Sequence, residues 1–89
     1  MVSQLVKITN PTGFHLRPAG NLCREAVRFK SKITFQYEGK NIANAKSVLS
    51  VLGSCVAMGD EILLMCEGED EEEALKGLIH AVETGLGEE

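Results

Sequence analysis

A histidine, an arginine and a proline lie close together in the run Gly13-Phe14-His15-Leu16-Arg17-Pro18-Ala19. Apolar residues at helical spacing over residues 19–29 follow this run and predict a helix that starts one or two residues after His15, with Pro18 in the first turn, where a proline loses little. The unpaired N–H groups and the dipole of a helix start attract anions, and an arginine grips phosphate oxygens. We therefore expect His15 to accept a phosphoryl group, with Arg17 as its partner.

The alternative for His15 is an ordinary polar turn residue. Four polar residues follow at offsets of four, three and four, on one stripe of the predicted helix: Arg17, Asn21, Arg24 and Arg28. This stripe is either a solvated helix face partly paired with Glu25, or a positive surface that steers acidic protein partners toward His15.

A serine at the start of a second predicted helix, over residues 47–52, also has two interpretations. The hydroxyl of Ser47 either caps this helix or is a regulatory phosphorylation site. The helix amides would tolerate a phosphoryl dianion there. Beside Val48, Leu49 and Leu52, however, that dianion would repel an acidic partner that docks on them.

The composition limits the classes of function. A chain of 89 residues forms one small domain, residues 1–89, without room for a second lobe or an enclosed cofactor, and we expect no cofactor. The net charge of −4 argues against nucleic-acid binding. The sequence contains no apolar run of membrane-spanning length and no signal-peptide pattern, so we expect a cytoplasmic protein without membrane insertion.

Cysteines and histidines do not suggest a metal site, because Cys23, Cys55, Cys66, His15 and His80 lack the close spacing of zinc ligands. Each cysteine has one apolar neighbour in the chain, and we expect reduced thiols that serve as small core residues. His80 is expected to be structural or exposed. The acidic run 69–73 is interpreted as a helix start and its approach, with no catalytic role.

Alternating and helical patterns predict the element order β-α-β-β-α-β-α. Strands are expected over residues 2–9, 32–38, 40–43 and 60–67, the last of them central in the sheet and covered on much of both sides. The last helix is predicted to start at Asp70, with its carboxylate as the cap and Glu73 in a capping-box position. Its buried stripe is predicted to comprise Leu75, Leu78, Ile79, Val82 and Leu86. This order favours an α+β fold, with helices on one side of a mainly antiparallel sheet.

Two segments resemble signatures of the HPr family, the histidine-containing phosphocarriers of the bacterial sugar phosphotransferase system. The run around His15 is similar to the phosphohistidine signature, and Asn44-Ala45-Lys46-Ser47-Val48-Leu49 resembles the serine-bearing signature. The resemblance implies an open-faced β-sandwich: a four-stranded antiparallel sheet of order 1-4-2-3 with three helices on one face. It also implies transfer from Enzyme I to Nδ1 of His15, and onward to a histidine of sugar-specific A components.

The resemblance also assigns roles to residues of this chain. His15 and Arg17 would be the catalytic pair, and Leu16, Arg17 and Pro18 would stabilise the phosphoryl group. The partner-docking surface would comprise Leu16, Gly20, Asn21, Arg24, Val48, Leu49 and Leu52. Ser47 matches the serine that HPr kinase modifies, which adds a catabolite-control regulator to the expected partners. We expect a monomer, since the docking face must stay free.

Two other classes of function compete with a phosphocarrier. One is a regulatory binding module that acts mainly through phosphorylation of Ser47. The other is a small hydrolase of the acylphosphatase kind, which the size, the α+β order and an arginine near a loop would fit. No residue is well placed to activate water for such a hydrolase.

Overall fold

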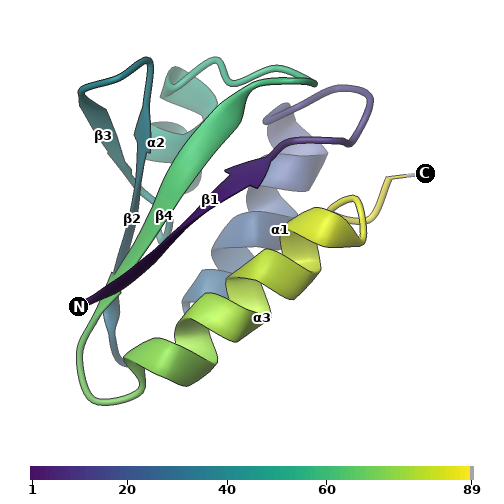
Figure 1. Ribbon diagram of the computed structural model, residues 1–89. Helices are drawn as coiled ribbons and strands as arrows, with labels where there is room; N and C mark the ends of the chain where they lie inside the picture. The colour runs from purple at the N-terminus through teal and green to yellow at the C-terminus, as the bar shows by residue number, and fades with distance from the viewer. Residues whose placement is uncertain (89) are drawn as a thin grey trace.

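The computed structural model describes residues 1–88. Four strands and three helices follow each other in the predicted order (Figure 1): β1 (Val2–Lys7), α1 (Leu16–Ala26), β2 (Lys32–Tyr37), β3 (Asn41–Asn44), α2 (Val48–Gly53), β4 (Glu61–Glu67) and α3 (Glu71–Glu83). The α+β class is confirmed.

The strands form one antiparallel sheet of order β1-β4-β2-β3, as the family resemblance implied. In β4, Ile62, Leu64 and Cys66 are buried toward the helices, while Leu63 and Met65 on the other face are half-buried. The central place of β4 is therefore confirmed, and its outer face is only partly covered.

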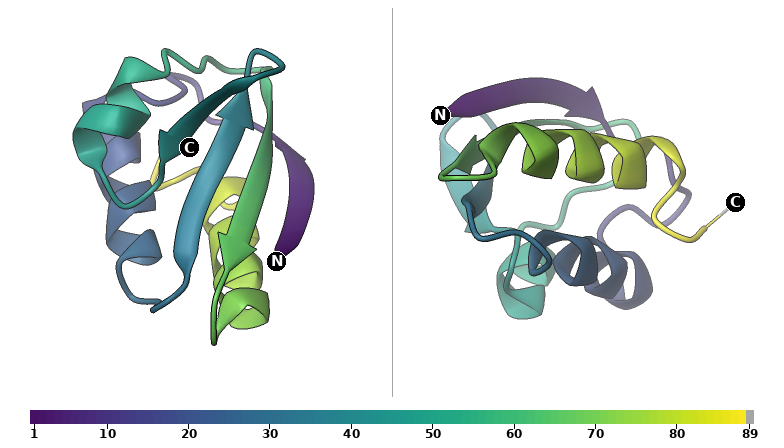
Figure 2. Two further views of the ribbon diagram at one scale, coloured as in Figure 1. Left: turned by 90° about the vertical axis from the view of Figure 1, so that its left-hand side faces the viewer. Right: turned by 90° about the horizontal axis from the view of Figure 1, so that it is seen from below.

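The helices lie on one side of the sheet, and the other side is open (Figure 2). The core between the two layers is apolar, and its largest fully buried side chains include Phe35, Ile8, Leu22, Ile33 and Leu78. Burial of each such side chain contributes about 1.5–3 kcal/mol. The helices that position the candidate site are thus fixed by packing on a continuous core.

The start of the first helix is confirmed, directly after His15 and with Pro18 in its first turn, but its predicted end is wrong. Helix α1 begins at Leu16, where the amide of Ala19 donates to the His15 carbonyl oxygen at 2.8 Å, and it ends at Ala26 rather than at Phe29. The chain turns away after Ala26 because the Asp70 carboxylate accepts hydrogen bonds from the amides of Lys30 and Ser31, both at 2.9 Å. A tertiary contact therefore ends the helix before its apolar pattern does.

The predicted capping of α3 by Asp70 is wrong. Asp70 occupies the N-cap position, but its carboxylate makes no capping bond because it accepts hydrogen bonds from residues 30 and 31 instead. Ahead of this helix, the carboxylate of Glu71 accepts from the amide of Gly68 at 3.1 Å. The buried stripe of α3 is formed by Ala74, Leu78 and Val82, with Leu75 and Ile79 half-buried beside it. Leu86, which was predicted in this stripe, is buried but lies beyond the end of the helix.

Candidate functional site

His15 lies at the N-cap of α1, with φ −73° and ψ 178°, and its side chain is exposed. Leu16, at the first helical position, is 70% exposed. The amides of Leu16 and Arg17 have no partner within residues 1–88, as expected for the first turn of a helix. Pro18, the third helical residue, has no N–H and is fully buried, so it fixes the backbone and contributes no donor.

The segment before His15 is anchored on both sides. The ring of Phe14 is 2% exposed and packs edge-on against Phe35, with ring centroids 5.3 Å apart. The amide of Phe14 donates to the Val56 carbonyl oxygen at 2.9 Å. A buried aromatic and a backbone bond therefore hold the exposed imidazole on a fixed stretch of chain.

The arginines of the predicted stripe differ in what they contact. Arg24 donates to the Asn21 side chain at 3.0 Å, and Arg28 forms a 3.0 Å ion pair with Glu25, as the solvated-face interpretation predicted. The side chain of Arg17 makes no hydrogen bond or ion pair with any other described residue. Its guanidinium is therefore available to an anion at the start of α1.

A cleft of about 390 Å³ opens beside the imidazole. It is lined by residues of two loops and the helix ends next to them: Thr12, Phe14, His15, Leu16, Leu52, Cys55, Val56 and Ala57. Of these, only His15, Leu16 and Leu52 were predicted as site residues. The rest of the wall comes from Thr12 and Phe14, just before His15, and from Cys55, Val56 and Ala57 in the loop after α2, which no local motif in the sequence marked.

Cys55 corrects the expectation that all three cysteines are core residues. Cys66 is buried and Cys23 is half-buried, but Cys55 is exposed in this cleft. The backbone of Cys55 has a φ of 56°, a left-handed conformation shortly after the end of α2. His80 is exposed, within the range predicted for it.

Glu88 also approaches the site, which the sequence analysis did not foresee. Its carboxylate accepts hydrogen bonds from the Asn10 side chain at 2.9 Å and from the Thr12 hydroxyl at 2.7 Å. These bonds, and to a smaller extent the charge of His15, lower the pKa of the Glu88 carboxyl. A carboxylate is thus held next to the loop that leads to His15.

Ser47 is the N-cap of α2, and its hydroxyl accepts a hydrogen bond from the Ser50 amide at 3.2 Å. The capping interpretation is therefore confirmed. The side chain is half-buried, and Leu49 beside it is 82% exposed. Capping and solvent access coexist at this residue.

The predicted docking residues come from two helices that pack together, α1 and α2. Leu16 and Leu49 are the most exposed large apolar side chains among them, and Arg24 is exposed as well. The side chain of Asn21, in contrast, is engaged within the protein: it donates to the Leu86 carbonyl oxygen at 2.8 Å and accepts from Arg24.

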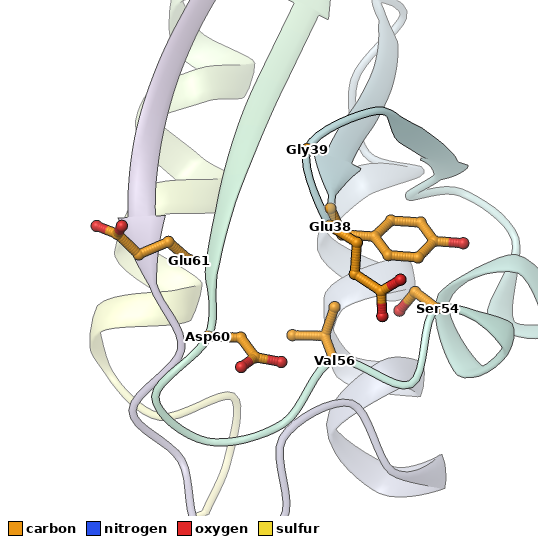
Figure 3. A pocket seen from close by; sticks show the side chains of 7 residues that line it. Glu38, Gly39, Ser54, Val56, Asp60 and Glu61 are labelled. Carbon is orange, nitrogen blue, oxygen red and sulfur yellow. The ribbon is translucent and has the colours of Figure 1, made fainter.

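A second pocket, lined in part by acidic residues, lies nearby and shares only Val56 with the cleft beside His15. Figure 3 shows the carboxylates of Glu38 and Asp60 turned toward this pocket, while that of Glu61 points away from it. The Asp60 carboxylate accepts from the Ala57 amide at 2.9 Å. Because its lining is acidic, this pocket disfavours phosphate groups, and we separate it from the candidate site.

Two features are absent from residues 1–88. No set of three or more His, Cys, Asp or Glu side chains is arranged to hold a metal ion. None of the helices is both long and apolar enough to cross a bilayer.

Known proteins resemble this chain over most of its length. The family model described as "PTS HPr component phosphorylation site" matches residues 2–84. The HPr-like protein Crh of Bacillus subtilis (strain 168) is 41% identical over 78 residues, which cover 88% of this chain and 91% of Crh. The phosphocarrier protein HPr of Buchnera aphidicola subsp. Acyrthosiphon pisum (strain APS) is 42% identical, with coverage of 88% and 91%.

The fold is equally similar to a solved structure. The crystal structure of HPr-C-His from Thermoanaerobacter tengcongensis superimposes with a TM-score of 0.94 at 37% sequence identity, and the match covers 100% of this chain and 99% of that one. Sequence and fold therefore agree on one group of relatives.

Proposed function

The chain belongs to the HPr family of phosphocarrier proteins, and from this premise we propose that His15 accepts a phosphoryl group from phospho-Enzyme I. The group then passes to a histidine of sugar-specific A components. The protein does not turn over a substrate by itself in this role. It holds the phosphoryl group between two partner enzymes.

The proposed step is a direct exchange between two imidazoles. A ring nitrogen of His15, Nδ1 by family resemblance, attacks the phosphorus of the donor phosphohistidine. The new N–P bond forms as the N–P bond of the donor breaks, and the electron pair of the broken bond returns to the donor nitrogen. Imidazole is both a good nucleophile and a good leaving group near neutral pH, so the same step runs onward to the acceptor.

One observation supports this proposal most directly: the exposed imidazole stands at a helix N-cap where nearby donors lack partners. The amides of Leu16 and Arg17 and the Arg17 guanidinium have no partner among the described residues. Helix-start amides and a free arginine fork favour a phosphoryl dianion. Leu16 and Arg17 are therefore proposed as its stabilising residues, with Pro18 holding their backbone.

The shallow site also fits a carrier. The cleft beside His15 is open on one side to solvent, and exposed Leu16 and Leu49 offer apolar contacts nearby. Two partners could reach the same nitrogen in turn, each supplying the rest of the stabilisation for the group in transfer. We predict a monomer, which leaves this face free. The three unpaired cysteines suit a reducing, cytoplasmic setting.

The test is labelling with phosphoenolpyruvate and Enzyme I. We expect an acid-labile, base-stable phosphoprotein whose label lies on His15 by mass spectrometry. A His15→Ala variant should fold normally, because its side chain is exposed, and should take up no label. Full labelling of that variant would refute the proposal.

Regulation through Ser47 is a second candidate function. The similarity to Crh and the half-buried, not fully buried, position of Ser47 favour it. In this role HPr kinase would transfer the γ-phosphoryl group of ATP to Ser47, and the product would bind a catabolite-control regulator. Incubation with HPr kinase and ATP should add one phosphoryl group at Ser47; no modification there, or no change in affinity for the regulator, contradicts this role.

A further inference from the structure

The chain turns back on itself after α3. The amide of Gly85 donates to the Val82 carbonyl oxygen at 3.1 Å and that of Leu86 to the Ala81 carbonyl oxygen at 3.0 Å, the pair of bonds that defines a Schellman motif. Gly85, Leu86 and Gly87 have φ values of 85°, 53° and 84°. Three successive left-handed residues redirect the chain, and the leucine among them adopts a conformation that is unfavourable for it.

Contacts with the rest of the protein hold this turn in place. The side chain of Leu86 is 3% exposed in the core, and its carbonyl oxygen accepts from the Asn21 side chain of α1 at 2.8 Å. The family model ends at residue 84, so this segment lies outside the matched region. The burial of Leu86 offsets its unfavourable backbone and directs the following residues toward the start of α1.

Glu88 ends up against the loop that precedes His15. One carboxylate oxygen, Oε1, accepts from Asn10 Nδ2 at 2.9 Å, from Thr12 Oγ1 at 2.7 Å and from the Thr12 amide at 3.3 Å. Asn10 Nδ2 also donates to the Gly13 carbonyl oxygen at 2.7 Å. A chain of hydrogen bonds thus connects Glu88 to the residue two positions before His15.

The charge of Glu88 persists at neutral pH. Its hydrogen bonds with Asn10 and Thr12 lower the pKa of the carboxyl, and a positive charge on His15 lowers it further. A Glu88 carboxylate that attracts a positive charge on His15 would have the opposite effect on a negative charge there. A phosphoryl dianion on the imidazole would be repelled by the same carboxylate.

We propose that Glu88 is a positioning residue for His15: it fixes the loop at residues 10–13 and disfavours the phosphorylated form electrostatically, so that the group is surrendered more readily. This inference rests on the proposed function. The step it affects is the exchange described above, in which the N–P bond on His15 breaks as the bond to the acceptor nitrogen forms. Glu88 touches neither reacting atom and acts through the loop and its charge.

A competition for the phosphoryl group tests the electrostatic effect. Equal amounts of isotope-labelled wild type and Glu88→Gln receive limiting phosphoenolpyruvate and catalytic Enzyme I, and intact mass spectrometry gives the phosphorylated fraction of each. Glutamine keeps an acceptor oxygen without the charge. We expect the group to favour Glu88→Gln by about two- to fivefold at low salt, the scale of an exposed charge pair, and less at high salt. Glu83→Gln, which removes an exposed negative charge on α3, is the control. In the same competition the phosphoryl group should divide equally between this variant and wild type.

Amide hydrogen exchange tests the positioning effect without any phosphoryl transfer. Glu88→Ala removes the acceptor, so the amides of Gly13 and Phe14 should exchange faster than in wild type, and Glu83→Ala should leave them unchanged. The proposal is overturned if Glu88→Gln takes up the same share of the phosphoryl group as Glu83→Gln does. It is also overturned if the amides of Gly13 and Phe14 exchange at the wild-type rate in Glu88→Ala. If Enzyme I phosphorylates none of the proteins, the proposed function fails, and the exchange measurement still decides whether Glu88 holds the loop.

Discussion

The amide of Phe14 donates a hydrogen bond of 2.9 Å to the Val56 carbonyl oxygen, which joins the segment before His15 to the loop after α2. Residues of both loops line the cleft beside the imidazole. Their close approach depends on Gly13, where a Cβ atom would clash with the same carbonyl oxygen. The position of His15 is therefore set by a contact between segments about forty residues apart in the chain.

Substitution of Gly13 by alanine should disturb both stability and transfer. The φ of Gly13 is +62°, and the added methyl group would clash with the Val56 backbone. We expect a loss of about 1–3 kcal/mol in the free energy of unfolding, measured in urea, and slower phosphorylation of His15. Gly20→Ala is the control: no atom lies within 4 Å of its new Cβ, so this helical position should gain about 0.5–1 kcal/mol. Equal stability of the two variants would contradict the prediction.

Arg17→Lys should impair transfer without affecting folding. Lysine keeps the positive charge but loses the planar fork that matches phosphate oxygens. We expect phosphorylation by Enzyme I to slow roughly tenfold, less than the loss of a donor in a water-excluded site. Thermal unfolding should be unchanged, since the side chain has no partner within residues 1–88. If Arg24→Lys slows the reaction as much as Arg17→Lys, the effect is not specific to the fork at Arg17, and this prediction fails.

Substitutions of Ser47 should separate its cap from its regulatory role. Ser47→Ala loses the bond from the Ser50 amide and should cost about 1 kcal/mol in urea unfolding. Ser47→Asp and Ser47→Asn both retain a capping oxygen, so their stability should stay near wild type. Only the aspartate adds charge beside Leu49, and it should weaken the interaction with an acidic partner. Equal partner affinity of the aspartate and asparagine variants would argue against electrostatic regulation at this residue.

Asp70 should make stability depend on pH in acid. Hydrogen bonds from the Ser31 hydroxyl and from the Lys30 and Ser31 amides lower the pKa of Asp70 from 3.8 to about 2. A carboxyl with a lowered pKa in the folded state stabilises the fold above its unfolded pKa, and this contribution is lost as the pH falls from about 4 to about 2. The free energy of unfolding, measured across this pH range, should therefore change less with pH in Asp70→Asn than in wild type.

A matched control is available on the same helix. Glu72→Gln removes one negative charge from the first turn of α3, where the side chain is exposed. Its slope in acid should resemble that of wild type. If Asp70→Asn and Glu72→Gln reduce the slope alike, the net charge of the helix start explains the effect and the hydrogen bonds of Asp70 do not.

The sequence was sufficient where local patterns and tertiary contacts agree. Alternation in residues 60–67 located β4 and its central place, because a strand with both faces partly covered needs apolar residues on both. The run around His15 identified the candidate imidazole, and an exposed N-cap position fits it. In these cases the type of each residue matches its own surroundings, buried or exposed.

Long-range contacts explain the errors. Asp70 was predicted as a helix cap, but it binds the chain around residue 30, forty positions away, and so also shortens α1. Glu88 reaches Asn10 across 78 residues. Cys55 is exposed, and its backbone is left-handed although it is not a glycine. Periodicity describes one element at a time, so it holds no information on partners of this kind.

Cysteine reactivity should rank the three thiols by their surroundings. Burial, followed by the charges of Glu71 and Asp70, raises the pKa of Cys66 to about 11, so this thiol should react only on unfolding. Cys55 is exposed and should be alkylated first by iodoacetamide at mildly alkaline pH, as mass spectrometry of peptides would show. Because Cys55 lines the cleft beside His15, its alkylation should also slow phosphorylation by Enzyme I. Cys55→Ser should resist both effects; alkylation of wild type that leaves the rate unchanged would mean that Enzyme I does not contact this wall of the cleft.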